Sequence, residues 1–293
     1  MKTLQDIVDR GRRIVFFGGA GVSTESGIPD FRSPDGLYRQ KYPYPPEIIL
    51  SHTFFELHPA EFFAFYRERM LYLDAKPNAA HRKLAEMERK GKLHGLVTQN
   101  IDGLHRAAGS RELFELHGSV HRNYCMECGR LYDAQFMRNS VGIPRCECGG
   151  VVKPDVVLYE EPLDEATARG AMRVISEADV LIVAGTSLNV YPAAGYLQSF
   201  RGRELVVINR DATPADADAS LVLREPVGEV LGRLNVQGGR GASTWIDCRK
   251  FCGRSARPVR TCFRRSWSGC MCMARSPSAA SGGRSATSIT SWS

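Results

Sequence analysis

The chain has 293 residues, of which 43% are hydrophobic, and its formal net charge is +7 at pH 7. This length is enough to bury one large core or two modest ones. The sequence holds no apolar run of about eighteen residues, which excludes a transmembrane helix, and its first residues lack the apolar segment of a secretory signal. We therefore expect a cytoplasmic protein with no membrane partner.

The excess positive charge lies in a C-terminal tail, residues 236–293, which holds nine Arg and one Lys but a single acid, Asp247. Residues 1–235 contain slightly more acids than bases. Three interpretations of the tail stay open: a nucleic-acid or membrane-binding arm, an inert disordered extension, or translation in a shifted reading frame. Its Arg, Ser, Cys and Gly content favours the last, and we expect no specific nucleic-acid partner.

The first predicted elements are an amphipathic helix, with Leu4 and Ile7 on its apolar stripe, and a buried strand at 14–17. The strand runs into Gly18-Gly19-Ala20-Gly21, which is typical of the phosphate-binding turn of a dinucleotide fold, although the usual G-x-G-x-x-G spacing is absent. Glycine lets the backbone approach a pyrophosphate closely, so Ala20 and Gly21 are candidate phosphate-binding residues. An ordinary strand-to-helix turn is the alternative.

A helix is predicted over 59–73, with Pro59 in its first turn. Phe62, Phe63, Tyr66 and Met70 recur on one face, and packing in the core explains most of these residues.

Three later strands of the prediction end in polar or small residues. These residues are Gln99, Asn100 and Asp102 after the second strand, Gly185, Thr186 and Ser187 after a later one, and Asn209 after the next. Because ligands gather at the carboxyl ends of parallel strands, we expect these groups to bind a ribose, a carboxamide or a phosphate. The alternation of strands and helices predicts an α/β fold with a doubly wound, Rossmann-like parallel sheet.

His117 follows a short apolar strand and is a candidate general base, because an imidazole with a pKa near 6.5 accepts a proton at neutral pH. A lone histidine is more often structural, and we interpret His105 and His121 in that way.

Four cysteines follow in two pairs, Cys125 with Cys128 and Cys146 with Cys148. In a chain without an export signal this pattern predicts one structural Zn²⁺ bound by four thiolates, in a small inserted module at about 120–152. A disulfide is the weaker alternative in a reducing compartment. The C-x-C spacing of the second pair is tight, and the adjacent glycines would give the backbone room.

Several of these segments together resemble the sirtuins, the NAD-dependent protein deacylases, of bacterial type. The segments are GAGVSTESGIPDFRS at 19–33, TQN-x-D-x-LH at 98–105, His-Gly at 117–118 and the cysteine pairs. The resemblance implies an NAD-binding domain made of residues 1–119 and 153–235, interrupted by the zinc module at 120–152. It ends near residue 235, where the composition changes.

The resemblance also implies roles for individual residues. His117 and Asn100 would be catalytic, and an acyl-lysine would lie along Val157, Leu158 and Tyr159. NAD would contact Ala20, Gly21, Thr24, Phe31, Arg32, Gln99, Ile101, Asp102, His117, Gly185, Thr186, Ser187, Asn209 and Val227.

The acyl preference follows from two further positions. Sirtuins that remove acidic acyl groups carry a Tyr and, three residues on, an Arg in the helix that matches 59–73. Phe63 and Tyr66 stand there in this chain, while a one-residue slip would bring Arg67 into register. Without a fixed cation, the resemblance implies a neutral acyl group such as acetyl, with Phe63 and Tyr66 at its pocket.

The implied reaction converts acetyl-lysine and the co-substrate NAD to lysine, nicotinamide and O-acetyl-ADP-ribose. The acetyl oxygen would attack C1′ of the nicotinamide ribose, and His117 would then deprotonate a ribose hydroxyl. The protein partners would be acetylated proteins, and we expect a monomer. Two alternatives stay open: a mono-ADP-ribosyltransferase that uses the same site, and a non-enzymatic zinc-ribbon protein that binds nucleic acid through the tail.

Overall fold

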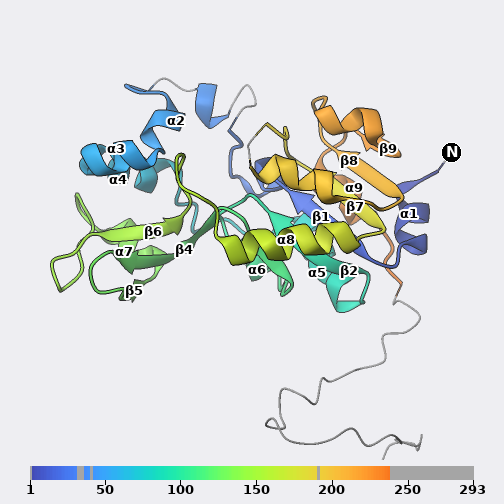
Figure 1. Ribbon diagram of the computed structural model, residues 1–293, viewed down its shortest axis with the longest axis horizontal. Coiled ribbons are helices and arrows are strands. Elements are labelled where there is room, and N and C mark those ends of the chain that lie inside the picture. The colour runs from blue at the N-terminus through green and yellow to red at the C-terminus, as the bar shows by residue number, and fades with distance from the viewer. Residues whose placement is uncertain (1, 32–35, 40–41, 190–191, 238–293) are drawn as a thin grey trace, which may run out of the picture. The chain divides into compact units, whose positions relative to one another are not determined.

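The computed structural model describes residues 2–31, 36–39, 42–189 and 192–237, all of which belong to one compact unit, Met1–Thr244 (Figure 1). Residues 238–293 of the tail predicted at 236–293 lie outside the described residues, and the prediction of a disordered or out-of-frame segment falls mainly on them. Val236 is described and is buried in the core. Arg32, a predicted NAD contact, also lies outside them. In the described part of the chain, no helix combines the length and the apolar character needed to cross a membrane.

A six-stranded sheet forms the centre of this unit, and every pair of neighbouring strands in it is parallel. Its order is β3-β2-β1-β7-β8-β9, so the chain builds outward from β1 in one direction and then returns to build in the other. This is the doubly wound arrangement that the sequence predicts. The strands are β1 (Ile14–Gly18), β2 (Leu93–Thr98), β3 (Leu113–Glu115), β7 (Val180–Ala184), β8 (Glu204–Ile208) and β9 (Leu221–Leu223).

Successive side chains of the central strands enter different cores on the two faces of the sheet, as the period of two along a strand requires. Phe16 packs in one core with helices α1 (Leu4–Arg10), α5 (Ala79–Arg89) and α9 (Val227–Gly232). Phe17 packs in another with α8 (Glu165–Glu177), which Figure 1 shows running across the sheet. The helices therefore cover both faces of the sheet, and its strands are apolar on both sides.

Capping side chains set where these helices begin. Thr3 caps α1, Asn78 caps α5 and Asp164 caps α8; each accepts a hydrogen bond from a backbone N–H of the first turn. A short helix, α6 (Leu104–Ala107), follows β2, and the 3-10 helices are Ala20–Val22, Thr24–Ser26, Leu37–Arg39, Ala193–Ser199 and Pro214–Asp218.

A smaller antiparallel sheet carries the cysteine pairs. Its order is β5-β4-β6, with β4 (Gly118–Cys125), β5 (Leu131–Tyr132) and β6 (Val152–Val156), and helix α7 (Ala134–Asn139) packs on β4. The sheet therefore extends slightly beyond the interval 120–152 that the cysteine spacing suggests.

Three helices between β1 and β2 share their core with this smaller sheet rather than with the large one. They are α2 (Pro46–Ile49), α3 (His52–Leu57) and α4 (Pro59–Arg69) (Figure 1). Their buried apolar side chains cluster with Val120, Met137 and Val152. Helix α4 ends four residues before the predicted end at Leu73.

Candidate active site

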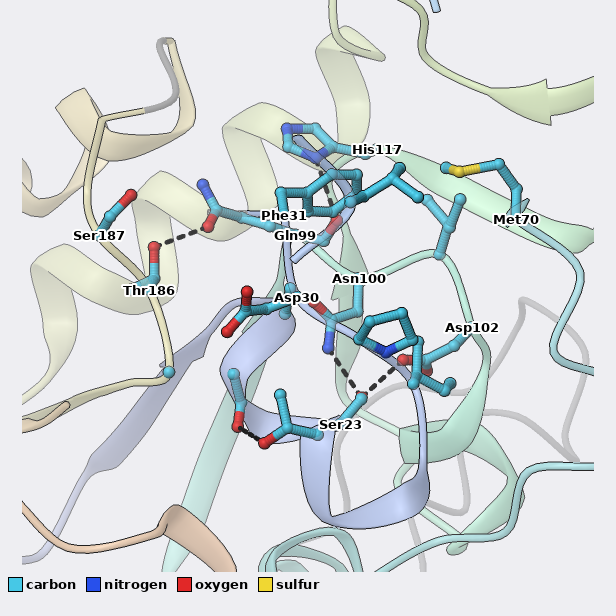
Figure 2. A pocket seen from close by; sticks show the side chains of 18 of the residues that line it. Ser23, Asp30, Phe31, Met70, Gln99, Asn100, Asp102, His117, Thr186 and Ser187 are labelled. Atoms are coloured by element: carbon cyan, nitrogen blue, oxygen red, sulfur yellow. Dashed lines mark hydrogen bonds between the residues drawn. The ribbon is translucent and has the colours of Figure 1, made fainter. Parts of the chain in front are cut away.

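A cavity of about 650 Å³ lies at the carboxyl ends of the central strands (Figure 2). Residues that directly follow β1, β2, β7 and β8 line it, among them Gly21, Gln99, Gly185 and Asn209. β1 and β7 are the neighbouring strands between which the building direction of the sheet reverses. In doubly wound folds, ligands bind at this switch point.

Most of the residues singled out in the sequence line this one cavity. They are Ala20, Gly21, Thr24, Phe31, Gln99, Asn100, Ile101, Asp102, His117, Val157, Leu158, Tyr159, Gly185, Thr186, Ser187, Asn209 and Val227. The structure thus brings together residues that are up to about two hundred positions apart, while their individual roles stay predictions.

The glycine turn after β1 packs directly on the turn after β7. The backbone N–H of Gly21 donates to the carbonyl oxygen of Gly185 over 2.8 Å. A Cβ atom at Gly21 would lie 2.8 Å from the Cα of Gly185, closer than real Cβ atoms approach. Gly185 itself has a φ of 59°, in the left-handed region that glycine adopts without strain. Both glycines are therefore required for the two turns to meet at the cavity.

A polar network fixes the loop after β2. Ser23 Oγ donates to Asp102 Oδ2 over 2.6 Å and accepts from Asn100 Nδ2 over 3.0 Å. The other carboxylate oxygen of Asp102 accepts from the backbone N–H of Leu104 over 2.8 Å. Burial raises the pKa of the Asp102 carboxyl group, and the hydrogen bond from Ser23 opposes that shift. Ser23 is the member of this network that sequence reasoning did not single out.

The side chain of Gln99 connects two of the loops that border the cavity. Its side-chain oxygen accepts a hydrogen bond from Thr186 Oγ1 over 3.0 Å, which joins the loops after β2 and β7. Its Nε2 atom is buried and has no hydrogen-bond partner among the described residues. An orphaned buried donor is unfavourable unless a ligand or water accepts from it.

His117 stands between β3 and β4, where the chain passes from the large sheet to the small one. Its Nδ1 atom lies 3.0 Å from the carbonyl oxygen of Gln99. Burial lowers the pKa of the imidazole, while that hydrogen bond raises it by less. Its backbone oxygen accepts from Val157 N–H over 3.1 Å, which places the segment at 157–159 beside it. Figure 2 shows His117, Phe31 and Met70 together in the upper part of the view.

Phe63 and Tyr66, the predicted acyl-pocket residues, are buried away from this cavity. Their exposed fractions are 0% and 1%, and neither lines the cavity. Both face the aromatic core: Phe63 contacts Phe55 with ring centroids 5.8 Å apart, and Tyr66 stacks on Phe62 at 5.9 Å. Because α4 ends at Arg69, the residues that reach the cavity from this region are Arg69, Met70 and Tyr72.

Other lining residues also escaped sequence reasoning. They include Asp30, Tyr38, Glu160 and Arg210, which lie on loops with no periodic pattern to indicate the direction of a side chain. Asp30 adjoins the predicted contact Phe31, and Glu160 adjoins Tyr159, so adjacency in sequence was the available signal.

The four cysteines of the small sheet form a cluster. Their sulfur atoms all lie within 4.8 Å of one another. The Sγ atoms of Cys125 and Cys148 are 3.4 Å apart, and those of Cys128 and Cys146 are 3.6 Å apart. A tetrahedral zinc with Zn–S bonds of about 2.3 Å separates its sulfurs by roughly 3.8 Å, so this donor set fits one structural Zn²⁺. A Cβ atom at Gly150 would lie 2.7 Å from Cys125 Sγ, which explains the glycine after the tight C-x-C pair.

A doubly wound sheet with a glycine turn and a polar cavity at its switch point defines a dinucleotide-binding α/β protein with an added four-cysteine module. The Sir2 family model matches residues 19–192. The chain is 58% identical over 232 residues to an NAD-dependent protein deacetylase of Clostridium acetobutylicum, covering 78% of this chain and 95% of that protein. It is 55% identical over 229 residues to one of Cutibacterium acnes, covering 78% and 94%. The chain belongs to the Sir2 family.

Solved structures agree with this assignment. A complex described as "Sir2-p53 peptide-NAD+" superposes with a TM-score of 0.69 at 38% identity, covering 80% of this chain and 97% of that one. A Sir2 homologue in complex with NAD gives a TM-score of 0.71 at 39% identity, with 78% and 90% coverage.

Proposed function

We propose that this protein is an NAD-dependent protein-lysine deacetylase, which converts acetyl-lysine and NAD to lysine, nicotinamide and O-acetyl-ADP-ribose. The observation that carries the proposal is the position of His117, which lies on the same cavity as the glycine turn at Gly21 and the segment at 157–159. Relatives with 44–58% identity are named NAD-dependent protein deacetylases, which supports the same reaction.

The cavity residues fit a dinucleotide. Gly21 leaves backbone space at the turn after β1, and the orphaned Nε2 of Gln99 offers a hydrogen bond to a ligand oxygen. Thr186, Ser187 and Asn209 follow the next strands and supply further polar groups for phosphate and ribose. When bound, NAD would supply an activated ribosyl carbon that accepts the acetyl oxygen.

His117 would be the general base of this reaction. Its Nδ1–H group donates a hydrogen bond to the carbonyl oxygen of Gln99, so Nε2 is the nitrogen that can accept a proton from a ribose hydroxyl. The Ser23 network would orient Asn100 and Asp102 toward the nicotinamide and its ribose. Phe31 would shield the reacting carbon from water.

The substrate lysine would lie along the segment at 157–159. The backbone of this segment is held on both sides: Tyr159 N–H donates to Leu50 O over 3.0 Å, and Leu158 N–H donates to Glu161 Oε2 over 2.9 Å, a contact that an added peptide strand would replace. A peptide would add to the segment as a further strand, a recognition mode that relies on main-chain hydrogen bonds.

Several further assignments are part of this proposal. Zinc would be structural, because four thiolates leave no open coordination position for a catalytic water. The preference for acetyl now depends on the named relatives rather than on Phe63 and Tyr66, which are buried. We also propose a cytoplasmic monomer whose NAD-binding domain is 1–119 and 153–235.

The test is nicotinamide release from NAD with an acetyl-lysine peptide, followed together with formation of the deacetylated peptide. We expect peptide-dependent release by the parent protein, and a loss of deacetylated product by at least about 100-fold in His117→Ala. The matched control is His94→Ala, which removes an exposed histidine outside the cavity and should retain activity. No release by folded, zinc-loaded parent protein would refute the proposal, and transfer of ADP-ribose to a protein would favour the transferase.

A further inference from the structure

Two tyrosines from distant parts of the sequence meet through their hydroxyl groups. Tyr38 OH and Tyr159 OH lie 2.6 Å apart, although 121 positions separate the residues in sequence. Both residues line the cavity. Tyr38 belongs to the region between the glycine turn and α2, and Tyr159 ends the proposed peptide-binding segment. The bond therefore joins the proposed nucleotide side of the site to its peptide side.

The Tyr38 end of this link is attached to Phe31. The backbone N–H of Tyr38 donates to Phe31 O over 2.9 Å, and the two rings meet edge to face with centroids 5.4 Å apart. The preceding residue, Leu37, donates its N–H to Asp30 O over 2.8 Å and is buried in the core of the small sheet. A displacement of the Tyr38 ring must therefore disturb the Phe31 ring.

At the other side of the hydrogen bond, Tyr159 belongs to the proposed peptide-binding segment at 157–159. Its backbone is held between Leu50 and His52, and Leu158 beside it is buried in the same core as Leu37. The Tyr159 side chain is 38% exposed, so hydrogen bonding to Tyr38 limits a ring that would otherwise be free to change rotamer. A peptide laid along the segment would restrict this ring further.

We infer that Tyr38 and Tyr159 are positioning residues, which couple binding of an acetyl-lysine peptide to binding of the dinucleotide. The inference rests on the proposed function. The peptide orders Tyr159, the hydroxyl pair holds Tyr38, and Tyr38 sets Phe31 against the ribose end of the dinucleotide. Coupling of this kind is reciprocal, so the dinucleotide must strengthen peptide binding by the same factor.

The experiment measures binding without turnover. The Kd for ADP-ribose, which lacks nicotinamide and cannot react, is determined by calorimetry with and without a saturating acetyl-lysine peptide. The ratio of the two Kd values is the coupling factor. We expect the peptide to tighten ADP-ribose binding to the parent protein, and Tyr159→Phe to reduce the coupling factor about two- to tenfold, as loss of one neutral hydrogen bond predicts.

A double-mutant cycle distinguishes loss of the Tyr38–Tyr159 hydrogen bond from nonspecific effects of the substitutions on the fold. Tyr38→Phe should reduce the coupling factor as much as Tyr159→Phe does, and the double variant should show no further loss. The Kd for ADP-ribose without peptide is measured for all three variants, because it is the reference from which each coupling factor is calculated. Tyr44→Phe is the matched control, because Tyr44 is 45% exposed and lies outside the cavity lining.

The inference is wrong if the peptide does not change the Kd for ADP-ribose in the parent protein, or if Tyr38→Phe or Tyr159→Phe keeps the coupling factor of the parent. It is also wrong if the reductions of the coupling factor in the two single variants add in the double variant. Its failure is distinguishable from failure of the proposed function, because nicotinamide release by the parent protein tests the reaction independently of these variants.

Discussion

The Nδ1 atom of His117 lies 3.0 Å from the carbonyl oxygen of Gln99. A carbonyl oxygen only accepts hydrogen bonds, so Nδ1 carries the proton and Nε2 is the basic nitrogen of the neutral ring. The contact joins the loop after β2 to the residue between β3 and β4. It therefore fixes both the tautomer of the proposed base and its orientation, as the partner of a catalytic histidine commonly does.

This contact leads to a prediction for the pH dependence of deacetylation. Burial lowers the pKa of His117 from its usual 6.5, so the neutral, active ring persists below pH 6.5. We expect kcat/KM to be flat from pH 8 to about pH 6.5 and to fall only as the pH drops through the lowered pKa. Initial rates of peptide deacetylation across this range provide the measurement, and an acid limb centred above pH 6.5 would contradict it.

The second prediction concerns Ser23. Ser23→Ala removes the donor to Asp102 and the acceptor of Asn100, two polar contacts in a buried setting. We expect kcat/KM for nicotinamide release to fall about 10- to 100-fold, because a hydrogen bond to a charged group contributes about 1.5–3 kcal/mol.

Ser26→Ala is the control for Ser23, three residues away. Its hydroxyl has no partner among the described residues and lies outside the cavity lining, so activity should be unchanged. Thermal melting of both variants checks the fold. Equal activity of the two variants would show that the Ser23 network has no part in the reaction.

The sequence indicated which residues would lie near one another wherever these residues follow the ends of predicted strands. Gln99 and Thr186 each follow a strand of apolar residues, and parallel strands bring their carboxyl ends to one edge of a sheet. Their contact over 3.0 Å follows from that topology. The four-cysteine cluster could also be predicted from the sequence, because the spacing of metal ligands along the chain is constrained by the coordination geometry.

The partners of the side chains on a helix could not be predicted from the sequence in the same way. Phe63 and Tyr66 lie on the predicted apolar face of α4, but the core that covers this face includes Phe55 of α3, which no pattern in the sequence of α4 identifies. The Tyr38–Tyr159 bond joins two loops whose approach depends on the whole fold. Periodicity identifies an apolar face but not the partner that covers it.

The third prediction concerns the metal. Cys128→Ser removes one thiolate from the cluster, and we expect the bound zinc to fall from one equivalent per chain to much less, with a clear loss of thermal stability. Val141→Ser is the control, since Val141 is 95% exposed in the same module. Elemental analysis and melting curves provide the measurements. A Cys128→Ser protein that keeps full zinc and full stability would exclude the four-thiolate site.

The last prediction concerns two buried histidines beneath the site, His81 and His105, whose ring centroids are 4.6 Å apart. Burial lowers the pKa of His81 to about 4 and that of His105 well below 6.5. The Nδ1 of His81 lies 3.2 Å from the backbone N and 3.0 Å from the Oδ1 of Asn78, at the start of α5. Neither ring nitrogen of His105 has a hydrogen-bond partner in the described part of the chain.

Because both pKa values are lowered on folding, the unfolded chain binds these protons first as the pH falls. The stabilisation is complete above the unfolded pKa of about 6.5 and is lost between pH 6.5 and 4, by about 3 kcal/mol at pH 4 from His81 alone. His105→Leu removes one titrating ring at a cost of less than about 1.5 kcal/mol at pH 7.5. Denaturant unfolding at pH 7.5 and pH 5 should therefore show a smaller loss of stability in His105→Leu than in the parent. Since every other titrating group is common to both proteins, equal losses would mean that His105 does not contribute.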